Sequence, residues 1–253
     1  NLSLLGCNVK FVAALGNDTY TPEIEHEAKK FKIDLSLCLH ADEQNSTYLF
    51  ITDENGDMLA AVNDMKINGK LTKSFFEPLL PWLSKMNAVV IDANLESSLL
   101  EYLCKSIKAP IFADAVSASK VMRLKSSLSY IHSFKPNAIE ASMLTGVEIS
   151  DFDSAREAAK ILVEKFGVGR VYLTMGSKGL IAYDGKEFIQ KPTVSKTVIN
   201  TAGAGDAFFA CTVAAELLKK PFEECAELAL KGAASVCKTE KSINAEIFND
   251  VFK

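Results

Sequence analysis

The segment best suited to a chemical role is a run of three small residues followed by an acidic one. It consists of Gly203, Ala204, Gly205 and Asp206. It stands directly before an apolar stretch that predicts a helix ending near residue 220. The first amides of a helix lack internal partners and sit at the positive end of its dipole, so they could hold a phosphate. The same run also fits a tight turn in which Asp206 only caps the helix.

A second fragment with spaced glycines follows a predicted strand, in the order Thr174, Gly176 and Gly179. Backbone amides exposed by such glycines could hold another phosphate group. An ordinary β-turn between two strands explains the same residues equally simply. The fragment by itself leaves both interpretations open.

A third fragment places Asn137 and Glu140 three residues apart, directly after another predicted strand. An amide and a carboxylate on one helix face could orient Mg²⁺ through water. Plain helix-start chemistry is the alternative, with Asn137 as the cap and Glu140 as its capping-box partner.

Alternating elements are needed to bring these fragments together. Predicted strands and helices follow one another in the manner of a parallel sheet covered on both faces. Ligands of such sheets lie outside the carboxyl ends of the strands, where all three fragments fall. The predicted strands are 8–15, 87–92, 110–114, 130–135 and 170–174 with a β-rich stretch over 180–198, and the predicted helices are 22–31, 71–83, 96–105, 138–144 and 154–166, with two long helices at the end.

One segment, about 42–66, interrupts this alternation. Two strands, 47–52 and 57–62, flank a turn that contains Asn55 and Gly56, which favours a tight hairpin. An isolated hairpin is marginal in water, so it must pack on the main body or on a second copy of itself. We interpret it as a small lid, and we expect a possible homodimer through its apolar face.

Composition narrows the classes of function. Of 253 residues, 48% are hydrophobic and 24% are charged, and 28 basic residues against 32 acidic ones give a net charge of −4. This balance argues against nucleic-acid binding, and no apolar stretch has the roughly 20 residues that a bilayer span requires. The six cysteines form no Cys-x-x-Cys pair and no secretion signal opens the chain, which indicates a cytoplasmic protein with reduced thiols.

In their order along the chain, three runs together resemble the ribokinase (PfkB) family of carbohydrate and nucleoside kinases. They are Asn-x-x-Glu, Thr-x-Gly-x-x-Gly and Asn-Thr-Ala-Gly-Ala-Gly-Asp. The likeness extends over the whole chain and implies a single kinase domain over 1–253, with a three-layer α/β/α core and a small β-lid. It also implies ATP and Mg²⁺ as cosubstrates and phosphoryl transfer to an alcohol. An amino-terminal part of the family pattern is expected to be missing before Asn1.

The resemblance implies roles for the matching positions. Asp206 would be the general base on the acceptor hydroxyl, with Gly203, Ala204 and Gly205 as the anion hole. The nucleotide contacts would be Thr174, Gly176 and Gly179, and Asn137 would act with Glu140 on the phosphates and, through water, on the metal.

Within the family, the fragments around 54–65, 92–95, 114–117 and 135–137 look most like bacterial pseudouridine kinases. That likeness implies conversion of pseudouridine to pseudouridine 5′-phosphate, with Asn17, Asp18, Asp64 and Asn94 as candidate contacts to the substrate. For Asn94 a loop cap, and for Asp64 a solvated lid edge, explain the residue as well.

Two residues depart from the pattern that the resemblance sets. Asn200 replaces an aspartate that helps to build a monovalent-cation site, so activation by K⁺ is not expected. Ala115 replaces the proline of an Asp-Pro-Val-Ser run. The remaining alternatives are a kinase for another substrate such as ribose, fructose or adenosine, and a non-catalytic nucleotide-binding relative.

Overall fold

A six-stranded sheet forms the centre of the computed structural model, which describes residues 1–52, 58–194 and 198–253. The strands lie in the order β12-β11-β10-β9-β8-β7. Strands β7 to β10 are parallel and β11 and β12 join as antiparallel strands. Their bounds are β7 Val89–Asp92, β8 Ile111–Asp114, β9 Ser133–Lys135, β10 Arg170–Thr174, β11 Leu180–Tyr183 and β12 Phe188–Lys191.

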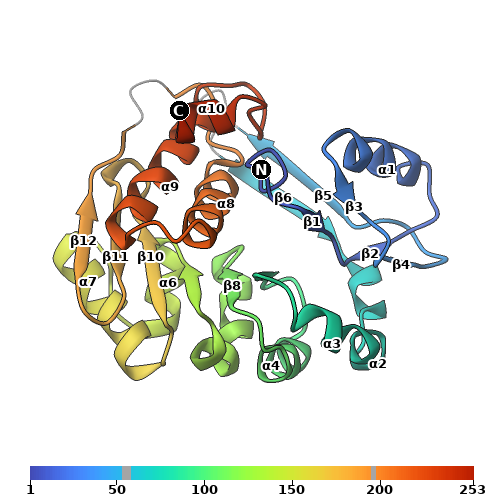
Figure 1. Ribbon diagram of the computed structural model, residues 1–253, viewed down its shortest axis with the longest axis horizontal. Helices are drawn as coiled ribbons and strands as arrows, with labels where there is room; N and C mark the ends of the chain where they lie inside the picture. The colour runs from blue at the N-terminus through green and yellow to red at the C-terminus, as the bar shows by residue number, and fades with distance from the viewer. Residues whose placement is uncertain (53–57, 195–197) are drawn as a thin grey trace.

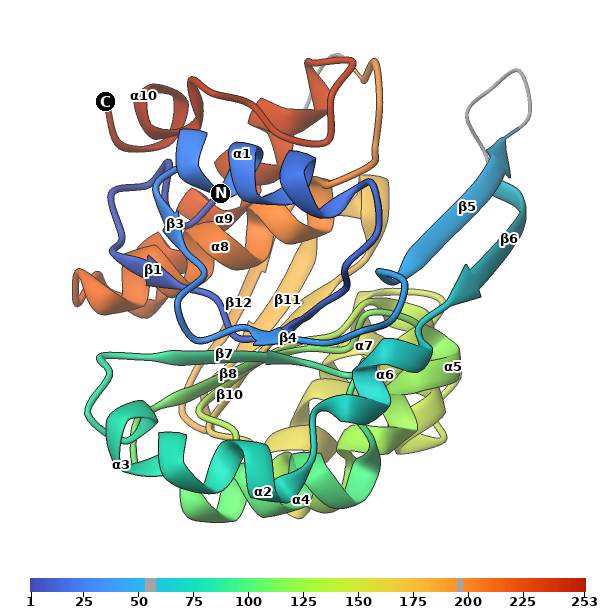
Figure 2. The ribbon, with the colours of Figure 1, turned by 90° about the vertical axis from the view of Figure 1, so that its right-hand side faces the viewer.

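Helices cover both faces of this sheet, which confirms the predicted three-layer α/β/α core (Figure 2). One apolar cluster contains residues of α4 (Ser97–Ser106), α6 (Ala138–Thr145) and α7 (Phe152–Lys160). On the opposite face a second cluster contains residues of α8 (Ala204–Leu217), α9 (Phe222–Cys237) and α10 (Ile247–Phe252). The two long helices were predicted, and the short α10 after them was not.

Helix α8 is fixed at its carboxyl-terminal end by one buried acid. The Glu216 side chain is 4% exposed, and its carboxylate accepts hydrogen bonds from Ser133 Oγ at 2.7 Å and Tyr172 Oη at 2.9 Å. It also lies 2.9 Å from His132 Nε2 and 3.0 Å from an Arg170 guanidinium nitrogen. These partners come from the beginnings of β9 and β10, so the helix is tied to the sheet at the end opposite Asp206.

The amino-terminal segment forms short strands beside the sheet (Figures 1 and 2). The predicted strand 8–15 divides into β1 (Val9–Lys10) and β2 (Ala14–Leu15), which pair in parallel with β3 (Ile33–Asp34) and β4 (Leu39–His40). The strand is interrupted where its pairing changes from β3 to β4. Helix α1 spans Thr21–Lys30, close to its predicted position.

The predicted lid is present as a two-stranded ribbon that extends away from the body (Figure 2). Strand β5 (Thr47–Thr52) pairs antiparallel with β6 (Met58–Asp64), with Thr47 opposite Asp64. The predicted turn with Asn55 and Gly56 lies outside the described residues.

The predicted continuous helix over 71–83 is wrong. The segment contains α2 (Lys73–Phe76), a 3-10 turn at Glu77–Leu79 and α3 (Leu80–Leu83), after another 3-10 turn at Lys66–Lys70. Pro78 and Pro81 explain the breaks, because proline has no amide hydrogen for a helical bond and restricts the residue before it.

Two further boundaries differ from the prediction. The chain after β8 forms α5 (Ala118–Val121) and a 3-10 segment, Met122–Tyr130, so β9 begins at Ser133 rather than at residue 130. Of the β-rich stretch 180–198, residues 195–197 lie outside the described part.

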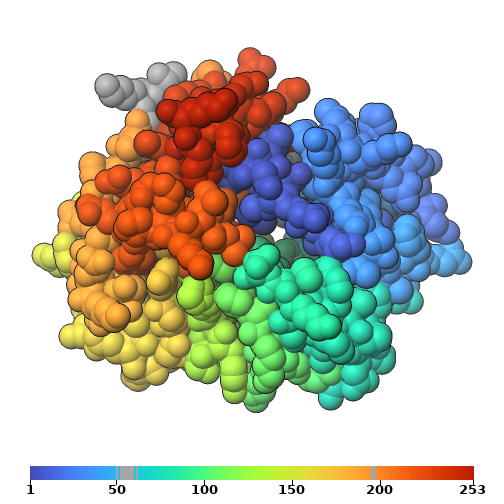
Figure 3. Space-filling view, in the orientation of Figure 1, coloured from blue at the N-terminus to red at the C-terminus, as the bar shows by residue number. Residues whose placement is uncertain are grey.

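The amino-terminal segment, α8–α9 and the region of β7 and β8 meet on one face of the molecule (Figure 3).

All six cysteines are unpaired, and Cys104, Cys211, Cys225 and Cys237 are buried. The burial of these four agrees with the expectation that the cysteines are reduced thiols of the core, whereas Cys7 and Cys38 are only partly buried. Among the described helices, none has both the length and the apolar character that crossing a bilayer requires.

Candidate active site

Charged side chains stand side by side at the carboxyl ends of three neighbouring strands. Asp92 at the end of β7 is in register with Asp114 at the end of β8, which is in register with Lys135 at the end of β9. The Lys135 ammonium lies 2.9 Å from the Asp114 carboxylate, and both side chains are largely buried, at 10% and 14% exposure. We call Asp92, Asp114 and Lys135 the strand-end row.

The beginning of α8 faces this row. Gly203 has φ +80°, and a Cβ there would lie 2.0 Å from the Ser242 carbonyl oxygen, so glycine is required. The Ala204 amide donates to the Thr201 carbonyl at 3.1 Å. In the described part of the chain, the amides of Gly205 and Asp206 have no backbone acceptor. These two amides are therefore open to a ligand.

Asp206 lies in the first turn of α8 and keeps contact with solvent. Partial burial of its carboxylate raises the pKa of Asp206, and the negative charges of Asp114 and Asp92 raise it further. The positive charge of Lys135 acts in the opposite direction and lowers this pKa. A carboxyl group whose pKa is raised toward neutrality is a better proton acceptor than an ordinary aspartate.

Lys135 connects the two parts of the site. A Cβ built on Gly205 would lie 3.3 Å from Lys135 Nζ, which places the ammonium directly beside the first turn of α8. Sequence reasoning did not select Lys135 or Asp114 as site residues. In the sequence they stand at the ends of predicted strands and open the fragments 114–117 and 135–137, and neither signal says which strands are neighbours.

The Asn137 and Glu140 pair forms the capping box that was one of the two sequence interpretations. The Glu140 amide donates to Asn137 Oδ1 at 2.9 Å, and the Asn137 amide donates to Glu140 Oε2 at 2.7 Å. Glu140 is 3% exposed, and this burial raises the pKa of its carboxyl group. Its Oε1 atom has no hydrogen-bond partner among the described residues, so one oxygen is still available as a ligand.

Thr174, Gly176 and Gly179 lie at the junction of β10 and β11, beside Asn137. Thr174 forms an isolated parallel bridge with Asn137. Gly179 has φ +109°, and a Cβ there would meet the Lys191 carbonyl oxygen at 2.0 Å, whereas the space around the Gly176 α-carbon is open. The fragment thus forms a strand-to-strand turn, and Gly176 leaves room for a ligand to approach it.

Asn17 and Asp18 hold the beginning of the lid segment. The Asn17 side chain donates to the Asp42 carboxylate. The Asp18 carboxylate accepts the Asn45 backbone amide at 2.7 Å and the Asn45 side-chain amide at 2.6 Å. These hydrogen bonds from Asn45 lower the pKa of Asp18. Both side chains are already engaged within the chain.

Asn94 lines a small cavity below the lid, and Asp64 lies between two residues that line it, Asn63 and Met65, without lining it itself. Asp64 pairs with the exposed Lys66 at 3.1 Å, and hydrogen bonds from Lys66 lower the pKa of the Asp64 carboxyl. Asn94 donates from its side chain to Asp92 Oδ2 at 2.8 Å and accepts from Lys120 Nζ at 2.6 Å. The interpretation of Asn94 as a loop cap accounts for its bonds to Asp92 but not for the bond to Lys120.

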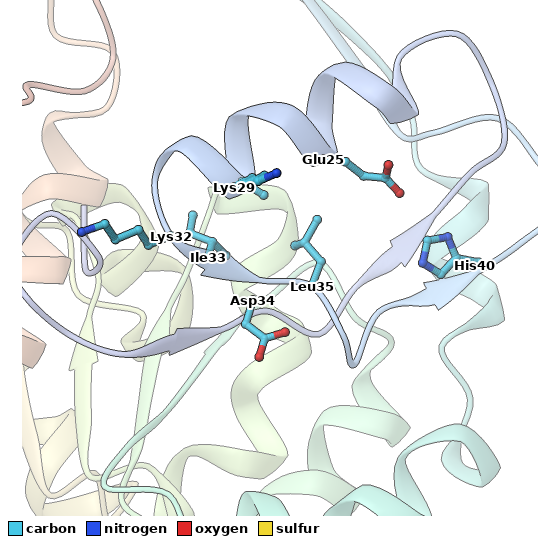
Figure 4. A pocket seen from close by; sticks show the side chains of 8 residues that line it. Glu25, Lys29, Lys32, Ile33, Asp34, Leu35 and His40 are labelled. Carbon is cyan, nitrogen blue, oxygen red and sulfur yellow. The ribbon is translucent and has the colours of Figure 1, made fainter.

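A hollow of about 570 Å³ lies elsewhere. It is open and lies under α1, where Glu25, Lys29, Asp34 and His40 line it (Figure 4). Acidic and basic side chains line it together, and Asp34 already pairs with Lys10. We therefore place the site at the strand ends, where the charges converge.

Comparison with known proteins decides the family. The family model described as pfkB family carbohydrate kinase matches residues 1–247. The chain belongs to the pfkB family of carbohydrate kinases. It is 30% identical over 251 residues to the pseudouridine kinase of Escherichia coli (strain K12), covering 98% of this chain and 80% of that protein.

Solved structures confirm the ribokinase-like fold of this PfkB kinase. The ribokinase of Thermotoga maritima superimposes with a TM-score of 0.84 at 19% identity, covering 99% of this chain and 83% of that one. The ribokinase of Arabidopsis thaliana, solved with ribose and ATP, gives a TM-score of 0.80 at 21% identity, with 99% and 84% covered. This PfkB kinase is thus a phosphotransferase with an alcohol group as acceptor.

Proposed function

We propose that this PfkB kinase transfers the γ-phosphoryl group of ATP to a hydroxyl of pseudouridine and releases pseudouridine 5′-phosphate. Identity of 30% over 98% of the chain to a pseudouridine kinase supports the choice of substrate. The observation that carries the reaction is the position of Asp206, between the strand-end row and the open amides of α8.

Asp206 acts in this proposal as the general base. Its carboxylate faces the site, and the nearby carboxylates of Asp92 and Asp114 raise its affinity for a proton. As the acceptor oxygen attacks phosphorus, the hydroxyl proton moves to Asp206. A base of this kind contributes on the order of 10²- to 10⁴-fold to the rate.

Lys135 and the first turn of α8 stabilise the charge of the group in transfer. Phosphoryl transfer depends mainly on positioning and on neutralising charge on the phosphoryl oxygens. The Lys135 ammonium and the amides of Gly205 and Asp206 converge on one place, and the small residues Gly203 and Ala204 let the backbone approach it. Asp114 holds the ammonium in position through its ion pair.

The chemistry of Glu140 suits a hydrated Mg²⁺, because a carboxylate oxygen without a protein partner is a hard oxygen ligand. When bound, Mg²⁺ would neutralise phosphate charge. Glu140 would hold it through water, and Asn137 would keep Glu140 oriented through the capping box. No group of three or more metal-ligating side chains occurs among the described residues, and an ion held through water with the nucleotide's phosphates needs none.

The remaining predicted contacts take their places around this centre. Thr174, Gly176 and Gly179 would receive the nucleotide, on the Asn137 side of the site. Asp64 and Asn94 would lie on the substrate side, beneath the lid. Asn17 and Asp18 would act by holding the lid segment at Asn45.

Two further expectations remain proposals. A homodimer through the lid is supported by the exposure of Leu49, Ile51 and Val62, at 66%, 64% and 74%. Independence from K⁺ is supported by Asn200, whose side chain accepts from the Ala202 amide at 2.9 Å and donates to the Glu240 carbonyl of the segment after α9 at 3.0 Å.

The test is an ATP-consumption assay across pseudouridine, uridine, adenosine, ribose and fructose, with the phosphorylated product identified by mass. We expect pseudouridine to give the highest kcat/KM. A higher value for ribose or fructose would assign the enzyme to a free sugar, and turnover of none of the five would refute the proposal. The Asp206→Asn variant supplies the blank for contaminating kinases.

A further inference from the structure

A second, smaller cavity of about 230 Å³ lies between the base of the lid and the carboxyl ends of β7 and β8. Asn63, Met65 and Asn68 line it from the lid side, and Asn94, Lys120 and Arg123 line it from the sheet side. Ligand sites for whole small molecules usually measure about 300–1,000 Å³. This cavity therefore suits one ring of a substrate rather than the entire molecule.

The cavity is connected to the strand-end row through Asn94, which lines the cavity and is hydrogen-bonded to Asp92 of the row. Asn94 follows Asp92 by two residues, and its backbone and side-chain amides both donate to the Asp92 carboxylate at 2.8 Å. The charge of Asp92 acts in turn on Asp206. Asp92 thus links the cavity wall at Asn94 to the first turn of α8 at Asp206.

Lys120 is the cation of this cavity whose charge is least compensated. Its ammonium donates to Asn94 Oδ1 at 2.6 Å and to the thioether of Met65 at 3.4 Å. Both acceptors are neutral, sulfur accepts only weakly, and an ammonium has three hydrogens to donate. Among the described residues, no carboxylate forms an ion pair with Lys120.

The other cations of the wall already have partners. Arg123 donates to the Asn94 carbonyl at 3.0 Å and lies 3.9 Å from the Glu96 carboxylate. Lys66 pairs with Asp64 at 3.1 Å. Only the charge of Lys120 remains uncompensated, and Glu96 places a negative charge on the same wall. This suits a single neutral acceptor such as a ring carbonyl better than a doubly charged phosphate.

The orientation of the Asn94 side chain follows from its neighbours. Its nitrogen must face Asp92, because a carboxylate only accepts, and its oxygen must then face Lys120. The cavity therefore presents a fixed donor at Lys120, and the amide residues Asn63 and Asn68 also line it. Donors and acceptors of these kinds suit the edge of a pyrimidine-dione ring, which alternates carbonyl and N–H groups.

We propose that this cavity is the base subsite of the enzyme, and that Lys120 determines specificity by donating to a ring carbonyl of a uracil-type nucleoside. The inference rests on the proposed nucleoside kinase activity and extends it to the recognition of the base. Asn94 acts as the positioning residue that holds Lys120 toward the ring.

The experiment compares Lys120→Met with Lys125→Met, a matched change at an exposed lysine of the neighbouring 3-10 segment. We expect Lys120→Met to lower kcat/KM for pseudouridine by about 10- to 100-fold, as for a lost hydrogen bond from a charged donor. The value for ribose should change less than about threefold, and Lys125→Met should change neither. Lys120→Arg, which keeps the charge, should recover part of the loss.

Calorimetric titration with pseudouridine gives a readout that does not depend on turnover. If pseudouridine binds the wild type and binds Lys120→Met more weakly, the result supports the subsite even if no substrate of the panel is phosphorylated. This outcome separates the subsite from the proposed function. Equal losses of kcat/KM for pseudouridine and ribose would overturn the inference. So would a higher kcat/KM for a phosphorylated sugar than for pseudouridine, if it fell in Lys120→Met. Failure of the wild type to bind pseudouridine would also overturn it. Thermal melting confirms that each variant is folded.

Discussion

Helix α8 carries one carboxylate in its first turn, Asp206, and another near its end, Glu216, and their surroundings are opposite. Burial alone would raise the pKa of Glu216, but hydrogen bonds from His132 and Ser133 and the charge of Arg170 outweigh it and lower that pKa. Asp206 has mainly burial and negative neighbours, so its pKa is raised. One helix thus joins an acid that holds it in place to an acid free to take a proton.

The difference shows how the fold separates stability from reactivity. Desolvation raises the pKa of a carboxyl group unless hydrogen-bond donors and positive charges outweigh it, as they do at Glu216 but not at Asp206. The donors to Glu216 lie at the beginnings of β9 and β10, whereas the strand-end row lies at the carboxyl ends of the strands. The same sheet therefore anchors one end of α8, and its other end faces Asp206, the residue that we propose as the base.

The largest expected effect on stability comes from removing the anchor. We expect Glu216→Ala to lower the free energy of unfolding by about 3 kcal/mol, because it leaves a buried charge network without its acceptor. Glu224→Ala is the matched control, since Glu224 forms only a surface pair with Lys220 and should cost less than about 1 kcal/mol. Urea denaturation measures both. Equal costs would show that Glu216 is no anchor.

The largest effect on activity outside Asp206 is expected at Lys135. Replacing Lys135 with methionine removes the ammonium group that faces the first turn of α8. The loss of one such stabilising donor costs about 10²- to 10³-fold in kcat. Lys125→Met serves as the control, because Lys125 is exposed and lies outside both the strand-end row and the turn at 174–179. Steady-state kinetics measure both. A kcat for Lys135→Met within threefold of wild type would contradict the assigned role.

Gly203→Ala tests the reactive end of α8 through the backbone. Both Gly203 and Gly146 have positive φ, but only at Gly203 does an added Cβ meet another atom within 4 Å, at 2.0 Å from the Ser242 oxygen. Gly146→Ala should cost about 1 kcal/mol of left-handed strain, and Gly203→Ala should cost more and also lower kcat. Denaturation and kinetics on the two variants separate strain from displacement. If the two variants lost the same stability and had the same kcat, the close contact of Gly203 with the Ser242 oxygen would have no role at the site.

The smallest expected effect is a difference in the pH dependence of stability. The lowered pKa of Glu216 stabilises the fold above the ordinary glutamate value of 4.5, and this contribution is lost as pH falls through its folded pKa. The raised pKa of Asp206 has the opposite sign, because stability is lost as pH rises from 3.8 through its folded pKa. Glu216→Gln should therefore flatten the acid limb, while Asp206→Asn should be no less stable than wild type at neutral pH. Unfolding midpoints between about pH 3 and pH 7 measure both slopes.

Much of the fold followed from local sequence. The alternation of strands and helices, the lid strands and the capping box at Asn137 were all anticipated, because each depends on residues near one another in the chain. The break of the 71–83 helix at Pro78 and Pro81 was missed although its signal is local.

The contacts that define the site depend on strand order, which the sequence does not state. Lys135 meets Asp114 only because β8 and β9 are neighbours, and Lys120 meets Asn94 across 26 residues. The Glu216 network joins residues up to 84 positions apart. The engagement of Asp18 by Asn45 is likewise a contact between distant segments.

The most direct test of the central claim combines turnover and nucleotide binding in Asp206→Asn. This variant keeps the shape of the first turn of α8 and removes only the proton acceptor. We predict that kcat falls by at least about a hundredfold while the Kd for ATP stays within about threefold of the wild type. Turnover close to that of the wild type would show that another group accepts the proton and would contradict the account.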